Sequence, residues 1–299
     1  MCGIVGLFLK NPALEERLGQ LTAAMLEVMS ERGPDSAGFA VYQSAAGGKI
    51  KLTLRAETHC DFEALARDLG AVLDSDVAIC RHDDHAVLSL DPALEAVARQ
   101  EISRLSPRLH VMSVGSAMEL YKGVGAPAAV ADRFGLAAMT GTHAIGHTRM
   151  ATESAVTIAG SHPFSTGADQ CLVHNGSLSN HNDIRRRLRR EGLTFETEND
   201  SEVAAGYLSW RLSQGAKLDE ALTEALSELD GFYTFVVGTK SGFGVLRDPV
   251  ACKPAVMAET DDYVAFGSEY RALVDLPGIE DAHLFEPEPQ RVYFWERQS

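Results

Sequence analysis

The chain has 299 residues, enough for one large domain or two ordinary ones, and its 45% hydrophobic content is that of a globular protein with a sizeable core. With 42 acidic and 27 basic residues, its formal net charge is −15, which argues against nucleic acid or an anionic membrane surface as a partner and favours a small solute or a protein. No stretch approaches the roughly 18 apolar residues that a membrane-spanning helix needs, so we expect a soluble protein.

The chain opens with Cys2 directly after the initiator methionine, followed by GIVGLF, which is typical of a strand. No basic segment precedes this apolar stretch, so the start does not fit a secretory signal peptide. Cys2 could be an ordinary core residue, since free cysteines are commonly buried. The odd number of cysteines and the absence of a CxxC pair argue against disulfides or a thiolate metal site, and favour the cytoplasm. The other cysteines are Cys60, Cys80, Cys171 and Cys252.

The pattern of apolar residues predicts an α+β protein. Apolar residues recur at helical spacing between Leu14 and Met29, and the Gly and Pro of ERGPDSAG end that helix. From 49 to 114 the pattern predicts strand, helix, strand, strand, helix, strand, a ferredoxin-like arrangement that could form a small lobe. Short strands follow, with helices expected at about 201–213 and 217–229. We therefore expect packed sheets flanked by helices.

A thiol at the second position gains unusual chemistry once methionine is removed, because the nucleophile and a free α-amino group then belong to one residue. The α-amino pKa is about 7.7 to 8.0, so near neutral pH this group can accept the thiol proton. In CLVHNGSLSN we expect a strand that ends at His-Asn-Gly, where the Asn175 amide and the Gly176 N–H could stabilise an oxyanion. Asn175 and Gly176 could also form an ordinary turn.

Five motifs in chain order resemble those of class II glutamine amidotransferases, the family with an N-terminal cysteine nucleophile. They are MCGIVG, RGPDSAG, GHTRMAT, VHNGSLSN and TENDSEV. LRDPVACKP and AFGSEYRAL also resemble late strands of the family, so the resemblance covers nearly the whole chain except about 49–114. It implies a four-layer αββα fold over residues 1–299, with the 49–114 lobe inserted in it.

The resemblance also implies roles for the motif residues around the thiol. Cys2 resembles the nucleophile and its amino group the base. Asn175 and Gly176 resemble the oxyanion hole. Arg32 and Gly33 of RGPD would orient the cysteine terminus.

A second set of motif residues is implied to bind the substrate. Arg149 would hold its α-carboxylate through two guanidinium hydrogen bonds, and Asp200 would hold its α-ammonium group. Thr152 and His174, in the same motifs, are the other substrate-binding residues implied. From the residues alone, Arg149 could instead form a structural salt bridge, and Asp200 could cap the following helix.

The substrate and the partner are less closely defined. Met150 and Glu153 stand where family members often have tryptophan and histidine, so both glutamine and γ-glutamylmethylamide stay open as substrates.

We expect no acceptor domain before Ser299, which would place the acceptor chemistry on another polypeptide. The nearest resemblance is to the stand-alone amidotransferase subunit of N-methylglutamate synthase and related glutamate-synthase-like systems. It implies a partner synthase subunit that carries FMN and an iron–sulfur cluster, and no cofactor in this chain.

Two other functions stay open: a stand-alone amidase of this fold that releases its amine to solvent, and a pseudo-enzyme that binds glutamine as a signal. A sensor needs the substrate clamp but no thiol, so the nucleophile disfavours the second. His143 and His147 lack a carboxylate partner, and we expect no metal site. The five arginines of IRRRLRREG, within 185–190, predict a solvated helix face or a docking surface for an acidic partner.

Overall fold

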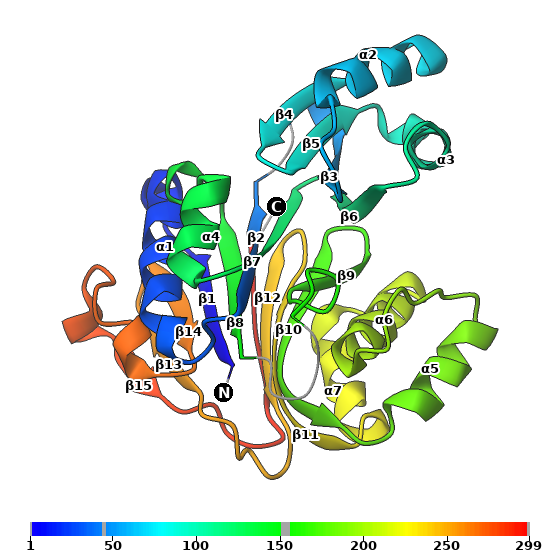
Figure 1. The fold of residues 1–299 in the computed structure, drawn as a ribbon. Coiled ribbons are helices and arrows are strands. Elements are labelled where there is room, and N and C mark those ends of the chain that lie inside the picture. Colours follow the sequence, from blue (N-terminus) through cyan, green and yellow to red (C-terminus); the bar gives the residue numbers. More distant parts are fainter. Residues whose placement is uncertain (1, 44–45, 151–155, 298–299) are drawn as a thin grey trace.

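Two antiparallel β-sheets face each other at the centre of the molecule, in a computed structural model that describes residues 2–43, 46–150 and 156–297 (Figure 1). The larger sheet has seven strands, in the order β15 (His283–Phe285), β13 (Val256–Glu259), β14 (Tyr263–Gly267), β1 (Gly3–Leu9), β8 (His143–Arg149), β2 (Ser36–Tyr42) and β7 (Met118–Val124). The smaller has five, in the order β16 (Val292–Glu296), β12 (Gly242–Arg247), β11 (Gly231–Gly238), β10 (Gln170–Leu178) and β9 (Phe164–Gly167).

Helices cover the outer face of each sheet. The larger sheet is covered by α1 (Leu18–Val28) and α4 (Pro127–Phe134), and the smaller by α5 (His181–Arg190), α6 (Asp200–Ser213) and α7 (Leu218–Glu228) (Figure 1). Three hydrophobic cores separate the resulting four layers. The predicted αββα architecture is therefore confirmed. Short 3₁₀ helices lie at Pro12–Arg17, Met29–Glu31, Ala46–Gly48, Pro92–Leu94, Leu136–Ala138, Tyr270–Ala272 and Ile279–Asp281.

The first strand, β1, is buried on both faces and occupies a central position in the larger sheet, between β14 and β8. Val5 and Leu7 belong to the core beneath α1, whereas Ile4 and Phe8 belong to the core between the sheets. This alternation follows from the two-residue period of a strand. Because both faces are buried, the strand reads in the sequence as a continuous apolar run.

The segment between β2 and β7 forms a separate lobe, which projects from one end of the sandwich in Figure 1. Its elements are β3 (Ile50–Ala56), α2 (Phe62–Leu73), β4 (Ala78–His82), β5 (His85–Leu90), α3 (Glu95–Leu105) and β6 (Leu109–Gly115). The antiparallel strand order β4-β5-β3-β6 is the ferredoxin-like one, and the lobe has its own hydrophobic core. Because β2 and β7 pair with each other, the insertion leaves the larger sheet continuous.

Asp169, in the turn between β9 and β10, ties the sandwich to the point where the lobe ends. Its carboxylate accepts hydrogen bonds from the backbone N–H groups of Ser116, Ala117 and Met118 at 2.8 to 2.9 Å. The Ser116 hydroxyl donates a fourth, at 3.0 Å. The Asp169 N–H donates to the carbonyl of Val114 at 2.8 Å. One buried carboxylate therefore fixes the connection from β6 to β7.

Replacing Asp169 by alanine would leave three backbone donors without an acceptor. We expect Asp169→Ala to lower the free energy of unfolding by about 2 to 4 kcal/mol in urea denaturation. Asp169→Asn keeps one acceptor oxygen and tolerates the left-handed backbone at this residue (φ 53°), so its loss should be smaller. Exposed Asp261→Ala is the control, and an equal effect of the two alanine variants would contradict this role.

Candidate active site

Cys2 lies immediately before β1, where side chains from two distant segments contact its main chain. Its carbonyl oxygen accepts a hydrogen bond from Arg32 Nε at 3.0 Å and another from Asn175 Nδ2 at 3.3 Å. Arg32 follows α1, and Asn175 lies on β10 in the other sheet. Cys2 is half-buried. The structure therefore brings three of the predicted catalytic residues together.

Arg32 is itself held by a carboxylate that sequence analysis did not single out. Its side chain is 8% exposed, and its guanidinium forms an ion pair with Glu269 at 2.6 Å. Arg271 pairs with the same carboxylate, also at 2.6 Å. The hydrogen bond from Arg32 holds the pKa of the Glu269 carboxyl below its usual value. Glu269 belongs to AFGSEYRAL, and its position two residues after the end of a buried strand was the available signal.

The glycines beside Cys2 allow three chain segments to pack closely. A Cβ atom on Gly33 would lie 2.4 Å from the carbonyl carbon of Thr148, and one on Gly3 would lie 2.8 Å from the Thr148 hydroxyl oxygen. That hydroxyl donates to the carbonyl of Met29 at 3.1 Å. Gly33 therefore lets the RGPD loop approach the end of β8 more closely than any other residue could.

Asn175 and Gly176 lie within β10, which continues to Leu178, so both the expected strand end and the alternative of a turn are wrong. They pair with Thr234 and Tyr233 of β11. Gly176 has φ 150°, and a Cβ atom there would lie 2.0 Å from the carbonyl oxygen of Phe232. Only glycine fits this backbone. The Asn175 amide nitrogen has two hydrogens, so a second donor is available beyond the one directed at Cys2.

Three buried histidines lie close together, and two of them share one hydroxyl group. His174 Nδ1 and His162 Nε2 each lie 2.8 Å from the Ser201 hydroxyl oxygen. His147 Nε2 donates to the carbonyl of His174 at 3.1 Å, and its ring stacks on that of His162 at 4.1 Å. Burial lowers the pKa of His147 to about 3 and that of His174 to about 4. These rings are therefore uncharged near neutral pH.

Asp200 is the first residue of α6, but it does not cap the helix. The Asn199 side chain does so, by accepting a hydrogen bond from the Ser201 N–H at 2.8 Å. Asp200 Oδ2 accepts from the backbone N–H of Leu178 at 2.8 Å, and Oδ1 lies 3.3 Å from the Ser201 hydroxyl. Asp200 Oδ1 also lies 3.7 Å from His174 Nδ1. Asp200 thus connects α6 to the strand that carries Asn175.

Arg149 is the last residue of β8 and is half-buried. Its carbonyl accepts a hydrogen bond from the Asp35 N–H at 3.1 Å, which joins β8 to the RGPD loop. A Cβ atom on Gly160 would lie 3.4 Å from one Arg149 guanidinium nitrogen, so this side chain reaches the segment before β9. Thr152 and Glu153 lie outside the described residues.

The thiol of Cys171 is in a different environment from that of Cys2. Cys171 is fully buried between the sheets, and its sulfur lies 3.2 Å from the hydroxyl of Tyr42. Burial raises the pKa of this thiol to about 12. Because the thiolate is the nucleophilic form, Cys171 is a poor candidate for catalysis.

The remaining sequence features have structural explanations. His143 Nε2 donates to the carbonyl of Thr239 at 2.8 Å, and its ring stacks on Tyr42 at 4.0 Å.

Within the described ranges, no group of three or more His, Cys, Asp or Glu residues could hold a metal ion. Nor do the described residues include a helix long and apolar enough to cross a membrane.

Three of the five α5 arginines form ion pairs within the chain, whereas Arg189 and Arg190 are exposed. Arg187 pairs with Glu228 at 2.6 Å. Two others also form ion pairs within the chain, Arg185 with Glu198 and Arg186 with Asp183. Arg185 is 3% exposed, so it stabilises the fold and is inaccessible to a partner. The exposed arginines of this helix stay consistent with both interpretations, a solvated face or a docking surface for an acidic partner.

Comparisons with known proteins agree with this geometry. A family model described as a glutamine amidotransferase domain matches residues 147–275. The chain is 60% identical to the glutamine amidotransferase-like protein GlxB of Rhizobium meliloti (strain 1021), over 100% of this chain and 99% of that protein. It is 33% identical to a Methanothermobacter thermautotrophicus protein assigned to the glutamine amidotransferases, over 98% of this chain and 99% of that one.

Two solved structures show the same fold over 99% of this chain. One, titled as the allosteric regulatory enzyme of purine biosynthesis, has a TM-score of 0.64 and 21% identity. The other, glutamine phosphoribosylpyrophosphate amidotransferase from B. subtilis, has a TM-score of 0.62 and 21% identity. The chain spans 47% of the length of each. At this identity the likeness shows the fold alone.

The uncharged histidines make stability depend on pH in a defined direction. The pKa of His147 is 6.5 in the unfolded chain and about 3 in the folded chain. As the pH falls from 6.5 toward 3, the unfolded chain therefore binds a proton that the folded chain does not, and the free energy of unfolding decreases. Between pH 7 and 5 we expect His147 to account for about 2 kcal/mol of lost unfolding free energy. His147→Gln should remove that part, measured by urea denaturation, and exposed His59→Gln should not. An identical pH dependence in His147→Gln and the unmodified protein would contradict this prediction.

Proposed function

The chain belongs to the glutamine amidotransferase family, and on that premise we propose that it hydrolyses the γ-amide of glutamine or of γ-glutamylmethylamide with Cys2 as the nucleophile. The observation that carries the proposal is the convergence of Arg32 and Asn175 on the carbonyl of Cys2. These two hydrogen bonds hold the main chain of the nucleophile beside an amide donor. Such fixed geometry is what a positioned nucleophile requires.

In the proposed reaction, the chain starts at Cys2 after removal of Met1. The free α-amino group takes the thiol proton, and the sulfur attacks the amide carbon to give a tetrahedral oxyanion. The second hydrogen of the Asn175 amide and the Gly176 N–H donate to this oxyanion. The amino group then returns the proton to the departing ammonia or methylamine, which leaves a thioester. Water, deprotonated by the same amino group, attacks the thioester and releases glutamate.

The proposed substrate clamp uses one positive and one negative side chain. Arg149 would pair with the substrate α-carboxylate, and Asp200 with its α-ammonium group. The close neighbours of the Asp200 carboxylate are a backbone N–H, a hydroxyl and a neutral imidazole, none of which neutralises its charge. A carboxylate can accept about four hydrogen bonds, so Asp200 keeps capacity for an ammonium group. His174 and Thr152 would complete this site.

We also propose that the released amine passes to a glutamate-synthase-like partner subunit, which would carry FMN and an iron–sulfur cluster. An amine that escapes into neutral water is mostly protonated, and its protonated form has no free electron pair for attack. Productive use of the amine therefore favours a sheltered path into a synthase. The alternative of a stand-alone amidase makes no such demand on a partner.

The direct test of the proposed reaction is amide hydrolysis by matched cysteine variants. We expect Cys2→Ala to lose at least about 1000-fold of the activity on glutamine or γ-glutamylmethylamide, because the attacking sulfur is removed while the α-amino group is kept. Exposed Cys80→Ala is the control and should keep full activity. Assaying both amides in parallel identifies the substrate. Activity retained in Cys2→Ala would mean that another group performs the attack.

The oxyanion role of Asn175 predicts a specific kinetic pattern. Asn175→Ala should lower kcat by about 100- to 1000-fold with little change in KM, because the donor acts mainly on the transition state. Asn182→Ala, on the exposed side of α5, should leave both constants unchanged. An effect of Asn175→Ala confined to KM would assign this residue to substrate binding instead.

The partner proposal predicts that hydrolysis depends on assembly. We expect the isolated chain to hydrolyse amides slowly, and the complex purified at native expression to be at least about 10-fold faster. The co-purifying chains should include a flavoprotein, recognisable by its absorption spectrum. Full activity of the isolated chain, with no partner recovered, would favour the stand-alone amidase.

A further inference from the structure

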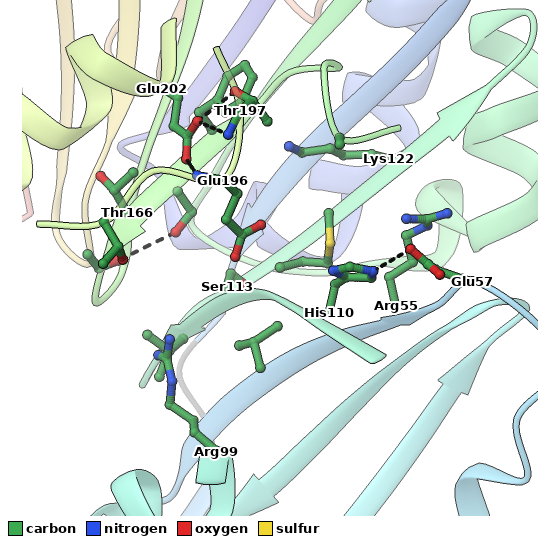
Figure 2. A pocket seen from close by; sticks show the side chains of 18 residues that line it. Arg55, Glu57, Arg99, His110, Ser113, Lys122, Thr166, Glu196, Thr197 and Glu202 are labelled. Carbon is green, nitrogen blue, oxygen red and sulfur yellow. Dashed lines mark hydrogen bonds and ion pairs between the residues drawn. The ribbon is translucent and has the colours of Figure 1, made fainter. Parts of the chain in front are cut away.

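A cavity of about 420 Å³ lies between the lobe and the sandwich, and Figure 2 shows the side chains that line it. One wall comes from β3 and β6 of the lobe, and the other from β7, β9 and the segment before α6. Cys2, Arg149, Asn175 and Asp200 do not line it. The cavity therefore needs an explanation of its own.

Lys122 of β7 presents a buried ammonium group to this cavity. Its side chain lies in the wall with 5% exposure, and Nζ is 4.5 Å from the centre of the Phe164 ring. Among the described residues, none forms a hydrogen bond or an ion pair with Lys122 Nζ. The ammonium group instead lies over the face of the Phe164 ring. Burial lowers the pKa of Lys122 to about 8, so the group still carries a charge at neutral pH. Glu202 and Glu196 attract this charge, but no described residue accepts a hydrogen bond from it, and a buried donor without an acceptor is costly.

A second buried donor lines the same cavity. Ser113 of β6 is 3% exposed, and its hydroxyl has no hydrogen-bond partner among the described residues. Arg55 and Arg99 add guanidinium groups to the lobe side of the wall (Figure 2). Buried polar groups in folded proteins are normally satisfied, so two unsatisfied donors at one cavity indicate a missing acceptor.

The acceptors that line the cavity are largely occupied. Glu202 accepts three hydrogen bonds, from the backbone N–H groups of Glu196 and Thr197 and from the Thr197 hydroxyl, at 2.6 to 2.7 Å. Glu57 accepts one from His110 at 2.7 Å. The Glu196 side chain lines the opposite wall, and its negative charge disfavours a multiply charged anion such as phosphate.

We propose that this cavity binds a small organic carboxylate, whose oxygens accept hydrogen bonds from Lys122 Nζ and Ser113 Oγ. Its carbon chain would lie against the apolar part of the wall, which includes Val111, Met112 and Phe164. An amino group at the far end of the ligand would meet Glu196. The site is separate from the amide-hydrolysis site, although Glu202 lies only two residues after Asp200 on the first turn of α6.

Isothermal titration calorimetry on the full chain tests the proposal with three probes: butyrate, 4-aminobutyrate and inorganic phosphate. We expect both carboxylates to bind and phosphate not to. Lys122→Met should weaken binding by about 30-fold or more and Ser113→Ala by about 10-fold, whereas exposed Lys240→Met should not change it. Binding should persist in Arg149→Ala, which lacks the guanidinium proposed for the amide substrate.

The controls separate this proposal from the proposed function. Thermal unfolding without ligand establishes whether each variant is folded. If Lys122→Met does not fold, the effect of Ser113→Ala on binding tests the proposal alone. Failure of both carboxylates to bind, binding unaffected by either cavity variant, or binding of phosphate alone would overturn the proposal. Loss of binding in Arg149→Ala with normal binding in Lys122→Met would also overturn it, because the probes would then occupy the substrate clamp.

Discussion

The structure depends on two hydrogen bonds to the carbonyl oxygen of Cys2. One comes from Arg32 beside the larger sheet and the other from Asn175 in the smaller sheet, so together they fix the start of β1 where the sheets meet. Glu269 holds the Arg32 guanidinium in turn. Because β1 is buried on both faces within the larger sheet, Gly3 and the residues that follow it are held in place from the start of the strand.

Few of the buried side chains near Cys2 and Asn175 are charged. His162 and His174 are connected through Ser201, and His147 stacks on His162. Burial keeps all three rings neutral near pH 7, which gives Asn175 a buried and uncharged support. Asp200 lies at the edge of that cluster and keeps an unneutralised carboxylate. In a site of low polarity, fixed donors and isolated charges act more strongly than they would in water.

The sequence predicted those features that local patterns determine. Alternating and helical periodicities predicted packed sheets flanked by helices and the ferredoxin-like lobe, and the family resemblance implied the four layers. The motifs also singled out Arg32 and Asn175, whose side chains contact the main chain of Cys2. Glu269 escaped notice because its partner Arg32 is 237 residues away in the chain. The strand through Gly176 was misjudged because Asn-Gly is also a turn signal, and only the pairing with β11 excludes a turn. The ion pair of Arg187 could not be predicted because its partner, Glu228, lies on another helix, 41 residues away in the chain.

The central claim is that the thiol of Cys2, in a chain freed of Met1, attacks the γ-amide carbon. Its most direct test is covalent trapping with a glutamine analogue that carries a diazoketone in place of the amide, followed by intact-mass and peptide analysis. The account predicts one adduct per chain, on Cys2, and only in chains whose first residue is Cys2 with a free amino group. An adduct on another cysteine, or on chains that retain Met1, would contradict it.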